Sequence, residues 1–252
     1  MSDVTVVCCW TNEKMYGDLV NSLKAQDIPC EIIGIDNRGN KGFTSCAAAY
    51  NSVMDDVKTK YVVYSHQDIL LDDAGTMSKF AEYLGRINRD DIVGVAGVRF
   101  DRAVIITNIM QKWHSKNDEI SYAGSRRVEG GMMECDTVDE CFFGGHTEHF
   151  REYPFDAEIC DNWHLYAVEA CLRTKSSGAG KIFVCDTPLI HLSSGTLSLK
   201  FWRNFYGVCR KYADKFPFIR TTCIDSRTDL LHFWLRFLRF CCGETLRKLG
   251  LH

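Results

Sequence analysis

Residues 61–70 read YVVYSHQDIL, and this stretch joins a buried strand to a group of polar side chains. Residues 61–64 are β-branched or aromatic, and no polar residue alternates with them, which predicts a strand covered on both faces. Residues 65–68, SHQD, follow at once, and apolar residues then resume. The stretch therefore raises a specific question, whether this strand ends in an ordinary turn or at the edge of a metal site.

Strands and helices alternate on both sides of this stretch. Further strands are predicted at 3–9, 30–36 and 91–100, and helices at 11–26, 43–57 and 73–88. The strands lack a polar face, and such alternation is typical of an α/β fold with a mostly parallel central sheet and helices on both of its faces.

The second half of the chain is less regular. Residues 101–136 are polar and contain glycine, and we interpret them as a long excursion or a β-hairpin region. A strand is predicted at 137–145, a helix at 162–176 and a last strand at 181–196, after which the chain becomes helical and aromatic. We expect one main domain over 1–225 and a C-terminal amphipathic helical extension over 226–252.

Composition narrows the class of protein. The chain has 252 residues and a net charge of −3, so it lacks the basic field of a nucleic-acid-binding protein. It contains no run of roughly 18 apolar residues that could span a membrane, and its first residues do not resemble a signal peptide. Thirteen scattered cysteines without a C-x-x-C pair favour reduced thiols in a cytoplasmic protein.

Polar side chains follow several of the predicted strands, where a parallel α/β sheet binds its ligands. The strand ends supply Thr11 and Asn12, then Asp36 and Asn37, then His66, Gln67 and Asp68, and finally His191, Ser193 and Ser194. Imidazole and carboxylate ligands suit Mn²⁺, whereas Mg²⁺ prefers carboxylate and phosphate oxygens. His66, Asp68 and His191 could supply such a set. The alternative, that His66 only ends a strand, stays open here.

No glycine-rich phosphate loop follows the first strand. Residues 9–12 read CWTN, which matches neither the dinucleotide-binding motif nor the P-loop. This argues against a dehydrogenase of the Rossmann type and against a P-loop NTPase, and it leaves a divalent metal as the means of holding a phosphate.

The chain resembles the GT-A glycosyltransferases of the family-2 type over roughly residues 3–220. The successions VTVVCCWTN, IIGIDNRGN and AAAYNSVMDDVKTKYVVYSHQDIL resemble the nucleotide-binding half, and VDECFFGG, FDAEICDNWHLYAVEACLR and VCDTPLIHLSSGT resemble the acceptor half. The likeness is greatest to the group in which HQD stands in place of D-x-D. It implies a metal-assisted, inverting transfer from a nucleotide-sugar donor, usually a UDP-sugar, to a glycan or lipid-linked acceptor.

The resemblance also implies roles for the residues at the strand ends. Asp68 would bind the metal that bridges the donor diphosphate, His66 would stand where the first acid of D-x-D stands, and His191 would be a third ligand or a diphosphate contact. The metal would be Mn²⁺ or Mg²⁺. The residues implied for donor binding are Thr11, Asn12, Asp36, Asn37 and Gln67.

The catalytic base is not decided by the resemblance. Family-2 enzymes use an Asp of a Glu-Asp pair just before a helix like EACLR, and Tyr166 and Ala167 occupy those positions here. The remaining candidates are Asp161, His164 and Glu169.

Asp161 and His164 are three residues apart at the predicted helix start, so they could share one helix face. Asp161 could equally be the N-cap of that helix. Asp139 is the expected acid of the acceptor site.

Two rival functions stay open. A nucleotidyltransferase also uses a metal at strand ends, but it should show a basic, glycine-rich loop after the first strand. A degenerate GT-A domain that only binds sugars or partners would explain the missing Glu-Asp pair.

Residues 229–250 place leucines and aromatic residues at helical spacing, with arginines interspersed. Two interpretations stay open. The helix could lie in a bilayer interface, at the inner face of a membrane, where a lipid-linked acceptor would be found. It could instead pack on the catalytic domain or on a second subunit.

Overall fold

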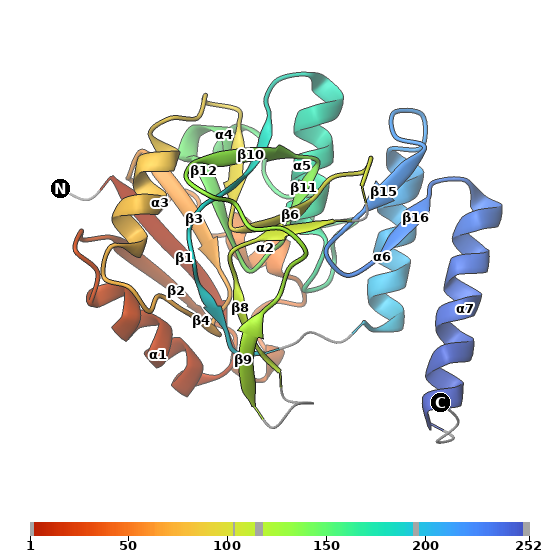
Figure 1. Cartoon of the computed structure of the whole chain (residues 1–252), viewed down its shortest axis with the longest axis horizontal. Coiled ribbons are helices and arrows are strands. Elements are labelled where there is room, and N and C mark those ends of the chain that lie inside the picture. Colours follow the sequence, from red (N-terminus) through yellow and green to blue (C-terminus); the bar gives the residue numbers. More distant parts are fainter. Residues whose placement is uncertain (1–2, 103, 114–117, 194–196, 249–252) are drawn as a thin grey trace.

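The computed structural model describes residues 3–102, 104–113, 118–193 and 197–248 (Figure 1). Its centre is a seven-stranded sheet in the order β10-β13-β5-β12-β3-β1-β2. These strands are β10 (Met132–Cys135), β13 (Ile182–Cys185), β5 (Ile92–Gly94), β12 (Phe142–His146), β3 (Tyr61–Ser65), β1 (Val4–Trp10) and β2 (Glu31–Asp36).

The central sheet is mixed, which corrects the expectation of a mostly parallel one. The pairs β1–β2, β1–β3 and β5–β13 are parallel, whereas β12 runs antiparallel to both β3 and β5, and β10 runs antiparallel to β13. Glycine lets β12 fit between its neighbours, because a Cβ on Gly144 would lie 2.2 Å from the carbonyl oxygen of Val62. The parallel pattern thus holds for the N-terminal strands.

Helices cover both faces of the sheet, as expected. Helices α1 (Glu13–Lys24) and α3 (Thr76–Leu84) pack on one face, and α2 (Cys46–Asn51), α5 (Tyr166–Ser177) and α6 (Leu199–Lys211) pack on the other (Figure 1). Within β1, Val6 and Cys8 belong to the apolar core on the first of these faces and Val7 belongs to the core on the second. Because both faces are buried, the strand shows no polar alternation in its sequence.

Two smaller sheets accompany the central sheet. The predicted strand 91–100 divides into β5 and β6 (Ala96–Val98), and β6 pairs with β7 (Ile105–Thr107) and β11 (Thr137–Val138). The other sheet has the order β4-β14-β8-β9. It consists of β4 (Ile69–Leu70), β14 (Ile190–His191), β8 (Met110–Trp113) and β9 (Glu119–Tyr122), and the β8–β9 hairpin confirms the interpretation of residues 101–136.

The C-terminal part contains more than helices. A hairpin of β15 (Phe218–Arg220) and β16 (Asp225–Arg227) separates α6 from α7 (Leu230–Lys248), and α4 (Thr147–Glu152) follows β12 earlier in the chain. Helix α7 lies beside α6 at the edge of the molecule (Figure 1). No helix in the described part of the chain combines the length and apolarity that crossing a bilayer requires.

Candidate active site

A cavity of about 380 Å³ opens beyond the carboxyl ends of β1 and β3. Its walls include His66, Asp68 and His191, together with Trp163 and His164 from the segment before α5. The pairing of β14 with β4 sets His191 opposite Ile69, which follows Asp68 directly. Strand pairing therefore brings together polar residues that are far apart in the sequence.

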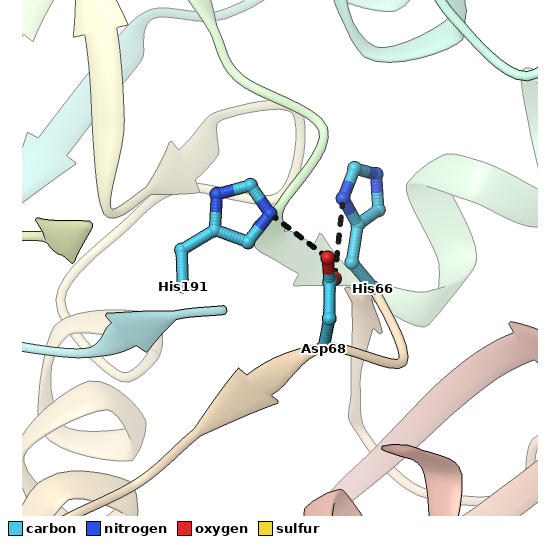
Figure 2. A group of neighbouring side chains, drawn as sticks. All are labelled: His66, Asp68 and His191. Carbon is cyan, nitrogen blue, oxygen red and sulfur yellow. Dashed lines mark ion pairs between the residues drawn. The ribbon is translucent and has the colours of Figure 1, made fainter. Parts of the chain in front are cut away.

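His66, Asp68 and His191 form a compact group (Figure 2). One potential ligand atom from each side chain lies within 4.8 Å of the others. Asp68 Oδ1 lies 4.0 Å from His66 Nδ1, and Asp68 Oδ2 lies 3.4 Å from His191 Nε2. Two imidazole nitrogens and a carboxylate are a donor set that fits Mn²⁺, so the residues present suit the expected metal.

Neighbouring side chains fix the orientation of this group. Ser193 donates a hydrogen bond to Asp68 Oδ2. Gln111 donates through Nε2 to the carbonyl oxygen of Ser193 at 2.8 Å, and its Oε1 lies 2.9 Å from His191 Nδ1. Because Oε1 can only accept, Nδ1 of His191 carries a proton, and Nε2 faces Asp68 Oδ2, to which it donates when the imidazole is protonated. Ser194 lies outside the described residues.

The electrostatics of the group favour an ionised carboxylate. Burial alone would raise the pKa of Asp68, but the hydrogen bond with His191 and the nearby His66 outweigh burial and lower the pKa below its usual range. Burial lowers the pKa of His66, which keeps that imidazole neutral. Burial would also lower the pKa of His191, but the hydrogen bond with Asp68 outweighs burial and raises it. A metal bound to Nε2 would therefore displace a proton from this imidazole.

The residues predicted to bind the donor separate into two groups. Gln67 Oε1 accepts hydrogen bonds from the backbone N–H groups of Thr11 at 2.9 Å and Asn12 at 2.8 Å, and both Thr11 and Gln67 line the cavity. The Asn12 side chain accepts from Met15 N and caps α1. Gln67 thus holds the end of β1 against the end of β3.

Asp36 and Asn37 are placed further from the cavity walls. Exposed Asp36 binds the Arg38 guanidinium at 2.7 Å, and these hydrogen bonds lower the pKa of its carboxyl. Asn37 is buried, and its Oδ1 accepts from the backbone N–H groups of Gly42 and Phe43. Asn37 therefore shapes the loop after β2.

The three base candidates do not lie together. Helix α5 begins at Tyr166 rather than at residue 162, so Asp161 is not its N-cap and does not share a helix face with His164. Asp161 instead binds Arg203 and accepts from Asn204 Nδ2 at 2.8 Å, both on α6. The helix cannot extend further back because Leu165 has a left-handed φ of 74°.

His164 lines the cavity, whereas Glu169 is buried in the protein interior. Burial lowers the pKa of the His164 imidazole, although the charge of Asp139 opposes that effect. Glu169 is fully buried and accepts from Lys211 Nζ and from the Tyr212 hydroxyl, each at 2.7 Å. Glu169 thus ties α5 to the end of α6.

Asp139 stands in the turn between β11 and β12. It accepts from Cys141 N at 3.0 Å and from the Thr222 hydroxyl. Burial would raise the pKa of Asp139, but the bond from Thr222 and the charges of His66 and His191 lower it.

Glu140 is a residue that sequence reasoning missed. It accepts a hydrogen bond from Leu165 N at 2.6 Å, and burial followed by the charge of Asp139 raises the pKa of Glu140 to about 8. Glu140 and His164 line a second cavity of about 260 Å³. The sequence feature that could have identified Glu140 is its position beside Asp139 in an otherwise apolar stretch. Ionisation of an acid is costly in such surroundings.

Comparisons with known proteins agree with the fold. The model of a glycosyltransferase-like family matches residues 5–202. GalNAc-T7, solved with UDP, GalNAc and Mn²⁺, aligns with a TM-score of 0.59 and 11% identity over 84% of this chain and 48% of that chain. TarS residues 1–349 from S. aureus, solved with UDP-GlcNAc, align with a TM-score of 0.56 and 14% identity over 84% of this chain and 66% of that chain.

These structural neighbours confirm the expected GT-A fold, and at such identities they show the fold alone. The chain spans about half the length of the GalNAc-T7 chain. No curated protein matches it by sequence.

Proposed function

The chain belongs to the glycosyltransferase-like family whose model covers residues 5–202, and from this premise we propose that it transfers a sugar from a UDP-sugar to a hydroxyl of a glycan or lipid-linked acceptor. Transfer would proceed with inversion. The observation that supports the proposal most is the placement of His66, Asp68 and His191 at one wall of a cavity that His164 also lines. GalNAc-T7, a protein of the same fold, was solved with UDP and Mn²⁺.

A divalent metal, Mn²⁺ or Mg²⁺, would be held by His66, Asp68 and His191. Bound there, it neutralises the negative charge that develops on the departing nucleoside diphosphate. Asp68 supplies the anionic ligand, and Gln111 and Ser193 hold His191 and Asp68 in place before the metal binds. Such preorganisation reduces the cost of assembling the site.

The donor would bind across the ends of β1 and β3. Thr11 and Asn12 are fixed there by Gln67, which places main-chain and side-chain groups of the first strand beside the metal-binding group. Trp10 stacks on Tyr16 with ring centroids 4.9 Å apart, and the Arg38 guanidinium covers Trp10. This stack and Asp36 lie outside the lining of the cavity and would border the nucleoside in the proposed complex.

His164 is the proposed base. It lines the metal-site cavity, and its lowered pKa leaves a neutral nitrogen at pH 7 that can accept the acceptor's proton. The negative charge of Asp139 acts on His164 in the direction that favours the imidazolium that results. Asp161 and Glu169 would instead stabilise the fold, because both accept hydrogen bonds from residues of α6 or the turn after it.

The proposal is tested by calorimetric titration of UDP with and without Mn²⁺. We expect binding that depends on Mn²⁺ in the wild type and in Asp72→Asn, because Asp72 is an exposed acid near the site in sequence. In Asp68→Asn, metal-dependent binding should be lost while the circular dichroism spectrum is unchanged.

UDP binding without hydrolysis of any UDP-sugar would favour a degenerate binding domain. Pyrophosphate release from UTP and a sugar phosphate would favour a nucleotidyltransferase. Absence of UDP binding at any metal concentration would contradict the proposal.

A further inference from the structure

The C-terminal segment of the chain has an unusual charge. Residues 197–248 contain eleven Lys and Arg residues and four Asp and Glu residues, whereas the whole chain has a net charge of −3. The rest of the protein is correspondingly acidic. Several of these cations are neutralised within the protein, since Arg203 pairs with Asp161, Lys211 with Asp156 and Glu169, and Arg236 with Asp225. Arg210, Lys215 and Arg239 have no acidic partner among the described side chains, and these cations can attract a partner with negative charge.

Helix α7 in this segment has two different apolar faces. Phe233, Phe237 and Phe240 pack around Trp202 of α6, with ring centroids 5.9, 5.5 and 5.1 Å away. A second stripe is exposed to solvent, and most of its side chains are about half exposed or more. It consists of Leu230, Leu231, Trp234, Leu235 and Leu238.

The packed face confirms contact with the catalytic domain, and the exposed stripe is left without a partner among the described residues. Next to this stripe, between α6 and α7, lies an almost wholly apolar groove of about 420 Å³ that includes Trp234 and Leu199. An amphipathic helix with an exposed apolar face and flanking arginines is the type of helix that lies in a bilayer interface.

Three cavities lie next to one another between the metal site and α7. The metal-site cavity and the cavity beside Glu140 share His164 as a wall. The Glu140 cavity and a third one of about 240 Å³ share Leu197 and Cys223. The shared lining residues place these cavities side by side, from the metal site past His164 to the side of α7.

The third cavity contains two arginines of α7, Arg236 and Arg239. Arg236 forms an ion pair with Asp225 at 3.1 Å. Arg239 is exposed and has no acidic partner among the described side chains. Leu235 and Leu238 flank Arg239 on the helix surface, so this guanidinium lies where the apolar stripe meets the cavity.

We infer that α7 docks on an anionic bilayer and that the acceptor is an anionic amphiphile drawn from it. Its negatively charged group would bind Arg239, its hydrocarbon would stay in the bilayer beside Leu235, and its hydroxyl would reach His164 along the adjacent cavities. This inference rests on the proposed function and names the acceptor class for the same site. The charge of the segment favours a lipid surface over a second copy of the chain, since two such copies would repel each other.

Docking is tested by flotation of the full chain with vesicles of phosphatidylcholine alone or mixed equally with phosphatidylglycerol. We expect binding to the mixed vesicles only. Arg239→Gln should weaken it roughly fivefold, and Leu235→Ser roughly tenfold, because one cation and one inserted leucine are lost. The matched controls are Lys24→Gln on α1 and Ile120→Ser on β9, an exposed cation and an exposed apolar residue elsewhere, and both should bind normally.

The connection to the site is tested with dihexanoylphosphatidylglycerol, a soluble anionic lipid with free hydroxyls, by saturation-transfer NMR. Cys223→Phe should obstruct the junction of the two cavities and abolish transfer to the glycerol protons, whereas Cys242→Phe, outside the junction, should not.

UDP titration of the same variants separates this inference from the proposed function. Normal Mn²⁺-dependent UDP binding with equal flotation on neutral and anionic vesicles, or with flotation unaffected by Arg239→Gln, would overturn the inference alone. A lipid signal that survives Cys223→Phe would overturn it too, as would a concentration-dependent dimer that Leu235→Ser dissociates. Anionic docking without UDP binding would overturn the proposed function instead.

Discussion

Glu140 accepts a hydrogen bond from the backbone N–H of Leu165 at 2.6 Å, and Leu165 is the left-handed N-cap residue directly before helix α5. A non-glycine residue in this conformation is unfavourable, so the contact stabilises a costly turn. The turn matters because it sets His164 against both cavities. The buried carboxyl of Glu140, between β11 and β12, thus helps to position the proposed base, His164, before α5.

The raised pKa of Glu140, about 8, predicts a specific pH dependence of stability. Between its ordinary value near 4.5 and about 8, the folded protein holds a proton that the unfolded chain has released. The free energy of unfolding should therefore fall as the pH rises through this window, by up to about 1.4 kcal/mol per pH unit.

Glu140→Gln should remove most of this slope, because the amide oxygen can still accept from Leu165 N and carries no charge. Urea unfolding at several pH values between 5 and 8 measures it, with exposed Glu129→Gln as the control. An unchanged slope in Glu140→Gln would show that another group titrates in this range.

Gln111 should set the metal affinity without touching the metal. Its Oε1 fixes the proton of His191 on Nδ1, and its Nε2 is anchored on Ser193 and Lys112. Gln111→Leu should weaken Mn²⁺ binding roughly 10- to 100-fold, as expected for the loss of a group that orients a ligand. Titration of Mn²⁺ by electron paramagnetic resonance measures this, and an unchanged affinity in Gln111→Leu would show that Gln111 does not orient His191.

Much of the fold could be predicted from the apolar pattern. The strands around residues 3–9, 30–36 and 61–66 were predicted within one or two residues, since strands buried on both faces read as continuous apolar runs. The direction of β12 could not be predicted in this way. An apolar run is equally suited to parallel and antiparallel neighbours, so the pattern does not contain the direction of the strand.

The sequence pattern correctly located those candidate site residues that lie at the ends of strands. His66, Asp68 and His191 each follow or end a strand, and the structure brings them together. Asp161 was misplaced on a helix because the pattern of 162–176 does not reveal the left-handed turn at Leu165. That turn depends on Glu140, a contact between distant parts of the chain that no local pattern encodes.

The two faces of α7 should respond differently to truncation. Phe233 is 2% exposed and packs on Trp202 and Phe205, whereas Leu235 is 56% exposed. Phe233→Ala should lower the free energy of unfolding by about 3–5 kcal/mol, the usual cost of removing a buried phenylalanine. Leu235→Ala should change it by less than about 0.5 kcal/mol. Comparable losses in the two variants, measured in urea, would mean that the exposed stripe is covered in solution.

The proposed base gives the most direct test of the mechanism. His164 borders the metal-site cavity, whereas Asp161 is held by Arg203 and Asn204, and Glu169 by Lys211 and Tyr212. His164→Ala should therefore lower kcat for UDP-sugar hydrolysis or transfer by roughly 10²–10⁴, with donor affinity within a few-fold of the wild type. Asp161→Asn and Glu169→Gln should lose stability rather than kcat.

The pH profile distinguishes His164 from a carboxylate base. Burial lowers the pKa of His164, so the wild-type kcat should stay constant on acidification until the pH falls below the ordinary histidine value of about 6.5, and then decline as the imidazole becomes protonated. In His164→Ala this acidic limb should disappear along with most of the rate. A normal kcat in His164→Ala, together with a large loss in Asp161→Asn, would instead identify Asp161 as the base. The ion pair with Arg203 would then have to open for each turnover, because it engages the carboxylate that must accept the proton.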